Sequence, residues 1–452
     1  MNAGSRARLD EILEEIDRID DLDLSFGEGS AKHEDMAGSP FAFFRGTASL
    51  FYRDLKSGRL AVDASRRSIT RIQGDSHFEN FGFLTEGGAW AAPHHVVFCP
   101  NDFDDAGVGH AEWDLLRYTV SLFLAADRAR CDEDGAYVDW PHDRVAHSPG
   151  FAAARKAAGK FLKSYRKTCK AIAARPDDCW DEAVCNFKPG HFLHDFEKKA
   201  KARAVRGADF ARKSKLAKAV DLESAVPRLA HQPGRLERLL GQRATAVIEA
   251  LRPYVDDVIC DVAMRFGAGL GARHADRFYL LVGPDAVARD GQDWRRILEL
   301  YHLVELKEQR PPAFLPHFPD VDPANRMSSA RLVIDCQRLM QRRPDRILDH
   351  VPWNDRHWLL RTRHHSKVGV DAEDLTDGDL EDNLADHARA SGRALALAHG
   401  RSDKRSRLFE CHMIERLAKA DRRRLVDTAE AYAAQVVGDW ALMRRAQSGS
   451  AP

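Results

Sequence analysis

Two short polar runs, each beside an apolar segment, constrain this chain more than any other feature. The first is QGDSHFEN at residues 73–80, which follows the apolar anchors Ile69 and Ile72. The second is NDFDDAG at residues 101–107, which follows an apolar run at residues 95–98 that predicts a short buried strand. A capping aspartate explains one such turn. Two of them close together are not explained by caps alone, and they indicate a site.

The acids and the amide have the spacing that phosphoryl transfer needs. Asp75 is followed five positions later by Asn80, and Asp102 comes after the next expected strand. In that chemistry the first Asp orients or deprotonates the attacking hydroxyl, while the Asn and the second Asp hold a divalent ion. His77, in the same turn, is grouped with Asp75 as a candidate catalytic residue; it is either a ligand or a brace that bonds the loop backbone, and bracing is the commoner role.

Composition excludes several other classes of protein. Lys+Arg and Asp+Glu both number 69 in 452 residues, which argues against a nucleic-acid binder that works through overall charge. Aromatic residues are sparse in the basic stretch at residues 198–218, so it is more typical of a solvated helical face or a mobile loop. No apolar run approaches the roughly 20 residues of a membrane span. The eight cysteines form no Cys-x-x-Cys pair, and we expect a cytoplasmic protein.

A strand, a glycine turn and a second strand are predicted in the second half of the chain. The strands are expected at residues 262–266 and 278–282, and the glycines between them are Gly267, Gly269 and Gly271. Glycines let backbone N–H groups approach phosphates without an intervening Cβ. The run also matches the alanine-ending dinucleotide fingerprint, but a strand rather than a helix follows it.

The next expected strand ends at Lys307. A lysine in this place commonly packs its stem along the surface and keeps its amine in water. After a glycine hairpin, it is also where a kinase-type fold puts the lysine that holds the α- and β-phosphates. Asp335, on a helix expected at residues 329–341, is the candidate acid that orients Lys307, and Glu305 and Glu308 are competitors.

Helical spacing predicts most of the remaining elements. Helices are expected near the N-terminus, from Pro40 through Leu55, at residues 115–124, through most of 150–252, and at 384–399 and 425–443, with a strand at 357–362 and a proline-rich loop at 311–323.

Several of these segments together resemble the bacterial family called domain of unknown function 2252, over roughly residues 41–402. They are residues 39–46, 74–82, 101–104 and 113–115, with LKE at 306–308, QRLMQ at 337–341 and ALAH at 396–399. That family has no settled activity.

The central motifs are also similar to the aminoglycoside-phosphotransferase branch of the protein-kinase-like fold. There a Gly-Asp-x-His-x-x-Asn loop precedes an acidic metal turn. The resemblance implies that Asp75 is the catalytic base and that Asn80 and Asp102 are metal ligands. It implies that Asp104 or Asp105 is a further acid at the metal or beside it.

The order of the motifs departs from an ordinary kinase, because here the catalytic loop precedes the glycine run. Circular permutation reconciles the two orders. We therefore expect an α+β, bilobal, protein-kinase-like fold that is circularly permuted. Residues 1–252 would form the first part of a helical catalytic lobe, 253–372 a strand-rich nucleotide lobe, and 373–452 a helical segment completing the catalytic lobe. The resemblance implies that Asp114 is a structural brace.

The expected function is a phosphotransferase that uses ATP with Mg²⁺ or Mn²⁺ and acts on a hydroxyl of a small molecule or protein. Lys307 and the backbone of the glycine run would hold the phosphates. Three alternatives stay open: a nucleotidyltransferase with the nucleotide reversed, a nucleotide-binding module without turnover, and a metal-dependent hydrolase. The hydrolase would use His77, Asp75 and Asp102 as ligands. The expected partners are a nucleotide and an unidentified hydroxyl acceptor, with no membrane and no nucleic acid.

Overall fold

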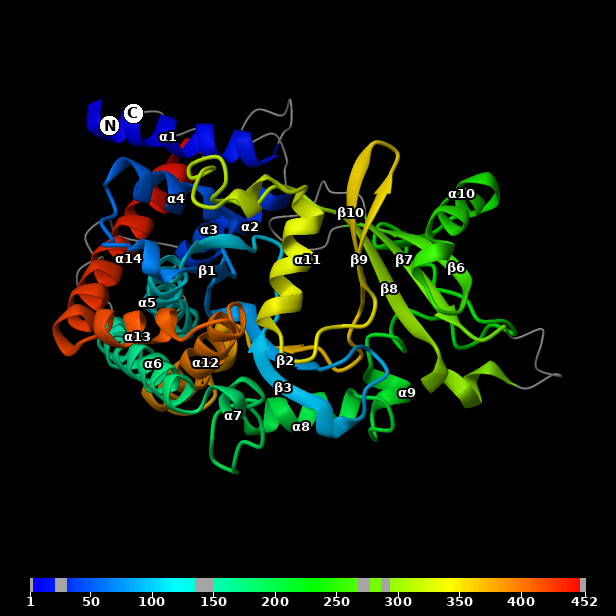
Figure 1. Ribbon diagram of the computed structural model, residues 1–452. Coiled ribbons are helices and arrows are strands. Elements are labelled where there is room, and N and C mark those ends of the chain that lie inside the picture. The colour runs from blue at the N-terminus through cyan, green and yellow to red at the C-terminus, as the bar shows by residue number, and fades with distance from the viewer. Residues whose placement is uncertain (1–2, 21–30, 135–148, 267–276, 286–292, 448–452) are drawn as a thin grey trace.

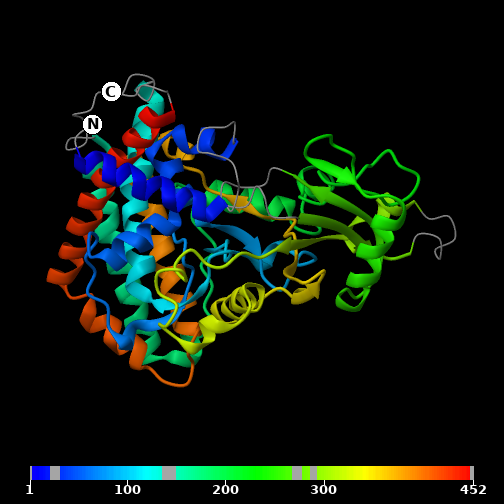
Figure 2. The same ribbon diagram turned by 90° about the horizontal axis from the view of Figure 1, so that it is seen from above.

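The computed structural model describes residues 3–20, 31–134, 149–266, 277–285 and 293–447. These residues form a mixed α+β fold with antiparallel sheets, which confirms the expected class. Figures 1 and 2 show most helices gathered at one end, the large antiparallel sheet at the other, and helix α11 between them. None of the described helices is both long and apolar enough to cross a membrane.

The helices are α1 (Ala3–Asp20), α2 (Ala31–Ala37), α3 (Pro40–Gly46), α4 (Ala48–Ser57), α5 (Ala111–Asp134), α6 (Pro149–Ala174), α7 (Pro176–Trp180), α8 (His194–Arg203), α9 (Phe210–Lys213), α10 (Gly241–Leu251), α11 (Ser329–Met340), α12 (Leu380–Arg401), α13 (Leu408–Arg416) and α14 (Lys419–Gln447). Helix α5 lies inside the helical end and packs against α6 and α14. Helix α12 packs closely along α6, because Gly392 brings the two backbones together. A Cβ on Gly392 would lie 2.4 Å from the carbonyl oxygen of Phe161, so the crossing requires glycine.

Two helical predictions need correction. The helix expected from Pro40 through Leu55 is broken into α3 and α4 at Thr47, where ψ is 45° and the side-chain hydroxyl donates to the carbonyl of Phe43 at 2.7 Å. Residues 150–252 are less helical than expected, since residues 214–235 contain no helix. That stretch instead packs buried apolar side chains, among them Leu216 and Leu229, against one face of the large sheet.

The large sheet has the order β5-β6-β7-β8-β10-β9 and is antiparallel throughout. Its strands are β5 (Leu236–Arg238), β6 (Val258–Arg265), β7 (Arg277–Gly283), β8 (His302–Glu308), β9 (Leu348–Trp353) and β10 (Arg356–Thr362). Strands β6 and β7 pair as the two arms expected on either side of the glycine run. The run itself, with Gly267, Gly269 and Gly271, lies outside the described residues.

Two small sheets position the polar turns. Strand β1 (Ile69–Ile72) pairs with β4 (Gly107–His110), while β2 (Phe81–Thr85) pairs with β3 (Val96–Pro100) and with β11 (Val368–Gly369). Residues 73–80 therefore connect β1 to β2, and residues 101–106 connect β3 to β4. Because β1 and β4 are partners, the ends of the two turns are held beside each other.

Candidate functional site

The two polar turns are in direct contact. The side-chain Nε2 of Gln73 donates to the carbonyl oxygens of Asn80 and Asp102, at 3.0 Å in each case. Gly74, with φ of +79°, faces the second turn so closely that a Cβ would lie 1.9 Å from the carbonyl oxygen of Asp105. Only glycine satisfies both the left-handed backbone and this approach.

Asp114, in the first turn of α5, fixes the backbone of the first polar turn by hydrogen bonds. Its carboxylate accepts from the backbone N–H groups of Gln73 at 2.7 Å and Gly74 at 3.0 Å. His399 of α12 lies against the same carboxylate, with Nε2 at 3.1 Å, and Nδ1 of that ring is 2.8 Å from the hydroxyl of Tyr165. Asp114 is thus the brace that the resemblance implied. His399 belongs to the ALAH motif, but nothing in the sequence assigned it this contact.

Asp75 is fixed by an arginine that sequence reasoning missed. Arg117, from α5, places Nε 2.7 Å and Nη2 2.5 Å from one carboxylate oxygen of Asp75. The Arg117 side chain is fully buried and also donates to the carbonyl of Phe44 at 3.0 Å. Its position within the apolar run of α5 is the signal that was available, because a buried arginine needs a partner.

His77 lies beside Asp75, with Nε2 3.6 Å from the second carboxylate oxygen. Burial, and then the nearby Arg45 and Arg117, hold the pKa of His77 well below its usual range. The imidazole is therefore neutral near pH 7. This arrangement suits a positioning contact in the turn better than a charged acid.

Asn80 and Asp102 lie in adjoining turns. The amide Nδ2 of Asn80 donates to the carbonyl of Asp75 at 2.8 Å, and the carbonyl of Asn80 accepts from the N–H of Asn101 at 3.0 Å. Oδ1 of Asp102 accepts from the N–H of Asp104 at 3.1 Å. The side chains of both metal-ligand candidates, Asn80 and Asp102, are therefore held by hydrogen bonds within their own turns.

Lys307 reaches the acidic turn from the large sheet. Its ammonium group donates to Oδ2 of Asp104, although 203 positions separate the two residues, and its side chain is 4% exposed. Gln309 adds a 2.7 Å bond to the carbonyl of Asp104, and the N–H of Ala313 donates to Asp105 at 2.8 Å. Segments from the first and third quarters of the chain therefore converge, as the expected site requires.

The carboxylates of this turn differ in protonation. Burial acts to raise the pKa of Asp104, but the cations of Lys307, Arg361 and Arg277 outweigh it and hold the pKa well below its usual value. Burial and the neighbouring carboxylates, Asp75 foremost, raise the pKa of Asp105 to about 7.

The expected partner of Lys307 was wrong. Among the described residues, Asp335 pairs instead with Arg71 of β1, at 3.1 Å, and its side chain is 36% exposed. The buried face of α11 is apolar, so its acid is turned toward β1 rather than toward the sheet. Of the competitors, Glu308 pairs with Arg356 at 3.0 Å.

Glu305 is the centre of an arginine cluster on the same face of the sheet as Lys307. It is fully buried and lies 3.0 Å from Arg361, 3.2 Å from Arg277 and 3.5 Å from Arg363. One carboxylate thus faces three guanidinium groups, which leaves positive charge beside the acidic turn.

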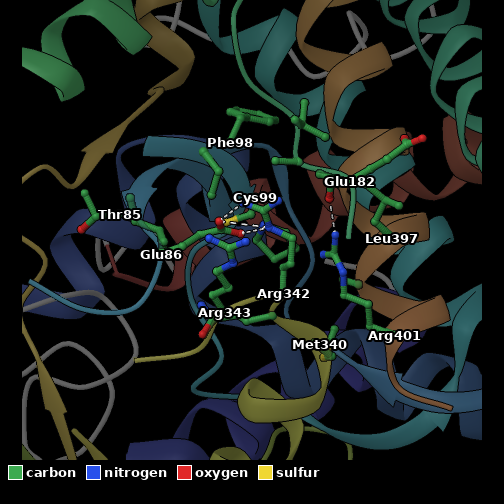
Figure 3. Close-up of a pocket in the computed structure, with 18 of the residues that line it drawn as sticks. Thr85, Glu86, Phe98, Cys99, Glu182, Met340, Arg342, Arg343, Leu397 and Arg401 are labelled. Carbon is green, nitrogen blue, oxygen red and sulfur yellow. Dashed lines mark hydrogen bonds and ion pairs between the residues drawn. The ribbon is translucent and has the colours of Figure 1, made fainter. Parts of the chain in front are cut away.

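Two pockets lie next to this centre. One, of about 440 Å³ including its open mouth, is lined by Asn101 and Phe103 of the acidic turn and by Arg361, Arg363 and Lys367. The other, of about 510 Å³, lies side by side with it, since four lining residues are shared. Figure 3 shows this larger pocket, where Arg342 points to Glu86 and Arg401 to the backbone of Glu182. Apolar parts of its wall are formed by Phe98, Leu397 and Met340.

The described residues contain no group of three His, Cys, Asp or Glu side chains arranged to hold a metal ion. His77, Asp75 and Asp102 are therefore not gathered as a ligand set. A Mg²⁺ site does not need three such side chains, because one or two carboxylates suffice when water and substrate oxygens complete the coordination.

The fold and site define a mixed α+β protein in which two acid-rich turns meet a lysine from an antiparallel sheet. The chain belongs to the family described as "Uncharacterized protein conserved in bacteria (DUF2252)", whose model matches residues 29–138 and 146–446. No curated protein and no solved structure matches it.

Proposed function

We propose that this protein is a phosphotransferase that depends on ATP and a divalent metal ion and acts on a hydroxyl of a small molecule or protein. The observation that carries the proposal is the contact of Lys307 with Asp104. A lysine that holds the phosphates and an acidic turn that binds the metal must both contact the same phosphate groups, so they have to lie close together.

The arrangement of the large sheet supports a kinase-like, circularly permuted fold with two lobes. In protein kinases a glycine-rich loop is followed by a lysine on the third strand, and then by a helix. Here β6 and β7 flank the glycine run, β8 is the next strand and carries Lys307, and α11 follows. The catalytic turns come earlier in the chain, which is the order a permutation produces.

The acidic turn fits a divalent cation. Oδ1 of Asp104 is buried and has no hydrogen-bond partner, and the neighbouring carboxylates of Asp75, Asp104 and Asp102 act with burial to raise the pKa of Asp105. Asp102, Asp104 and the amide oxygen of Asn80 would hold Mg²⁺ or Mn²⁺, whose oxygen preference they match. When bound, the ion supplies neutralisation of negative charge on the phosphoryl oxygens.

Asp75 would orient the acceptor hydroxyl and take its proton. In that step the acceptor oxygen forms a bond to the γ-phosphorus, the bond from this phosphorus to the bridging oxygen breaks, and ADP leaves. The role of Arg117 is to fix the carboxylate, since its two contacts leave Asp75 little rotational freedom.

The test is a thermal shift with ATP, with and without Mg²⁺, on the wild type and on Asp102→Ala. We expect stabilisation by ATP that needs the metal and is lost in Asp102→Ala; ligand at about 100 times its Kd stabilises by about 2.7 kcal/mol. Asp320→Ala removes an exposed acid and serves as the matched control. Absence of stabilisation by any nucleotide would contradict the proposal.

Asp75→Ala separates binding from chemistry. The variant should keep the metal-dependent stabilisation and lose ADP formation. If ADP formation survives in Asp75→Ala, Asp75 is not the base.

A further inference from the structure

The pocket beside the acidic turn is lined by an unusual concentration of positive charge, and we call it the basic pocket. Its cations are Lys215, Arg361, Arg363 and Lys367, and no carboxylate is among the described residues that line it. Lys215 comes from the basic stretch at residues 198–218, whose sequence is typical of a solvated face or a mobile loop, but here it lines a pocket.

Charge around the basic pocket is not balanced within the protein. Four carboxylates, those of Glu305, Asp104, Asp102 and Asp345, face the four pocket cations together with Arg277 and Lys307, a surplus of two positive charges. Glu305 is shared by three arginines, and Asp104 is engaged by Lys307. Burying unpaired cations is costly, so such a cluster is explained by a ligand that brings the missing negative charge.

One cation of the basic pocket lacks a partner. The ammonium group of Lys215 has no hydrogen bond or ion pair among the described residues, and burial with the nearby Arg363 and Lys367 lowers its pKa to about 8. This ammonium group is available to a bound anion.

We propose that the basic pocket binds an oligophosphate chain, such as the triphosphate of a nucleotide or an inorganic polyphosphate. A nucleobase needs flat apolar walls, and here only Leu84 and Phe103 are apolar. A volume of about 440 Å³ suits a small ligand rather than a nucleic-acid strand. Guanidinium groups match phosphate oxygens in pairs.

This site deepens the proposed function, on which its catalytic relevance rests, because Arg361 lies 3.8 Å from Asp104. The donor's phosphates would extend from the acidic turn toward residues 361–367. Binding of the oligophosphate in the basic pocket needs neither the metal nor Asp102. The basic pocket can therefore be tested separately from the proposed function.

The test is isothermal titration of the full-length protein with sodium tripolyphosphate in the presence of EDTA. Lys215→Gln is the informative variant, because this lysine has no partner to lose. Its affinity should fall about tenfold, the loss expected for one charge-assisted hydrogen bond. Lys198→Gln removes an exposed lysine from the same basic stretch and should bind as the wild type does.

The arms of the experiment separate the possible outcomes. If ATP and tripolyphosphate bind with equal affinity, the phosphate chain alone is sufficient for recognition. If ATP binds much more tightly, the ligand is a nucleotide. Both results support the site. Equal binding by Lys215→Gln and Lys198→Gln, no binding of tripolyphosphate at millimolar concentration, or displacement of tripolyphosphate by adenosine overturns it. If tripolyphosphate binds but ATP with Mg²⁺ does not stabilise the protein in the thermal shift, the proposed function is refuted and this site stands.

Discussion

Replacing Asp114 by asparagine tests how the first polar turn, residues 73–80, is held. The carboxylate is fully buried and accepts from two backbone N–H groups, of Gln73 and Gly74, and it also contacts His399. Asparagine has the same shape but one acceptor oxygen, so one backbone donor must face an NH₂ group. The loss of a charge-assisted bond, about 1.5–3 kcal/mol, adds to an unsatisfied buried donor, about 1–3 kcal/mol. We expect Asp114→Asn to cost about 3–5 kcal/mol.

The measurement is urea unfolding followed by tryptophan fluorescence. Asp335→Asn is the control, since that acid is 36% exposed and its ion pair with Arg71 contributes at most about 1 kcal/mol. If Asp114→Asn shifts the unfolding midpoint no more than Asp335→Asn does, the turn is held by something other than Asp114 and the reasoning is wrong.

Three further predictions concern positioning, pH and helix packing. Arg117→Lys, which loses the two-nitrogen hold on Asp75, should lower kcat about tenfold or more and leave metal-dependent ATP binding intact; a proportional loss of both would contradict the positioning role. Burial raises the pKa of Glu410 to about 7, so the folded state favours the protonated carboxyl, and the wild type loses stability as pH rises from about 4.5 to 7. In urea unfolding, Glu410→Gln should therefore be about 3 kcal/mol more stable than the wild type at pH 8 and equal to it near pH 4. Gly392→Ala should destabilise by about 2 kcal/mol, because a Cβ meets the Phe161 carbonyl, and an unchanged midpoint would show that α6 and α12 separate easily.

Local patterns predicted the elements that a short window of sequence defines. The strand expected to end at Lys307, observed as β8, was found from a short apolar run, and the helix at residues 329–341 from its apolar periodicity. Strand β2 was not expected; it pairs along its length with nearby β3, and its other edge pairs with β11, which joins Phe83 to Val368, far away in the chain. Pairings of that kind are decided by tertiary contacts, as is the break between α3 and α4.

The candidate site was predictable to a similar degree. Short motifs, through their residue types and spacing, singled out the acids of the two turns as candidates. Arg117 was not singled out, because its place in an apolar run indicates that it is buried but does not name Asp75 as its partner. Asp335 was misassigned for the same reason: the side of α11 that faces Lys307 depends on how the helix is rotated, and a sequence window cannot fix that rotation precisely enough.

The most direct test of the account is electron paramagnetic resonance of Mn²⁺ titrated into the protein with a non-hydrolysable ATP analogue. The account predicts one tight Mn²⁺ per chain that requires the nucleotide and disappears in Asp102→Ala, while Asp320→Ala behaves as the wild type. A Mn²⁺ signal that is the same with and without nucleotide, or that survives in Asp102→Ala, would contradict it.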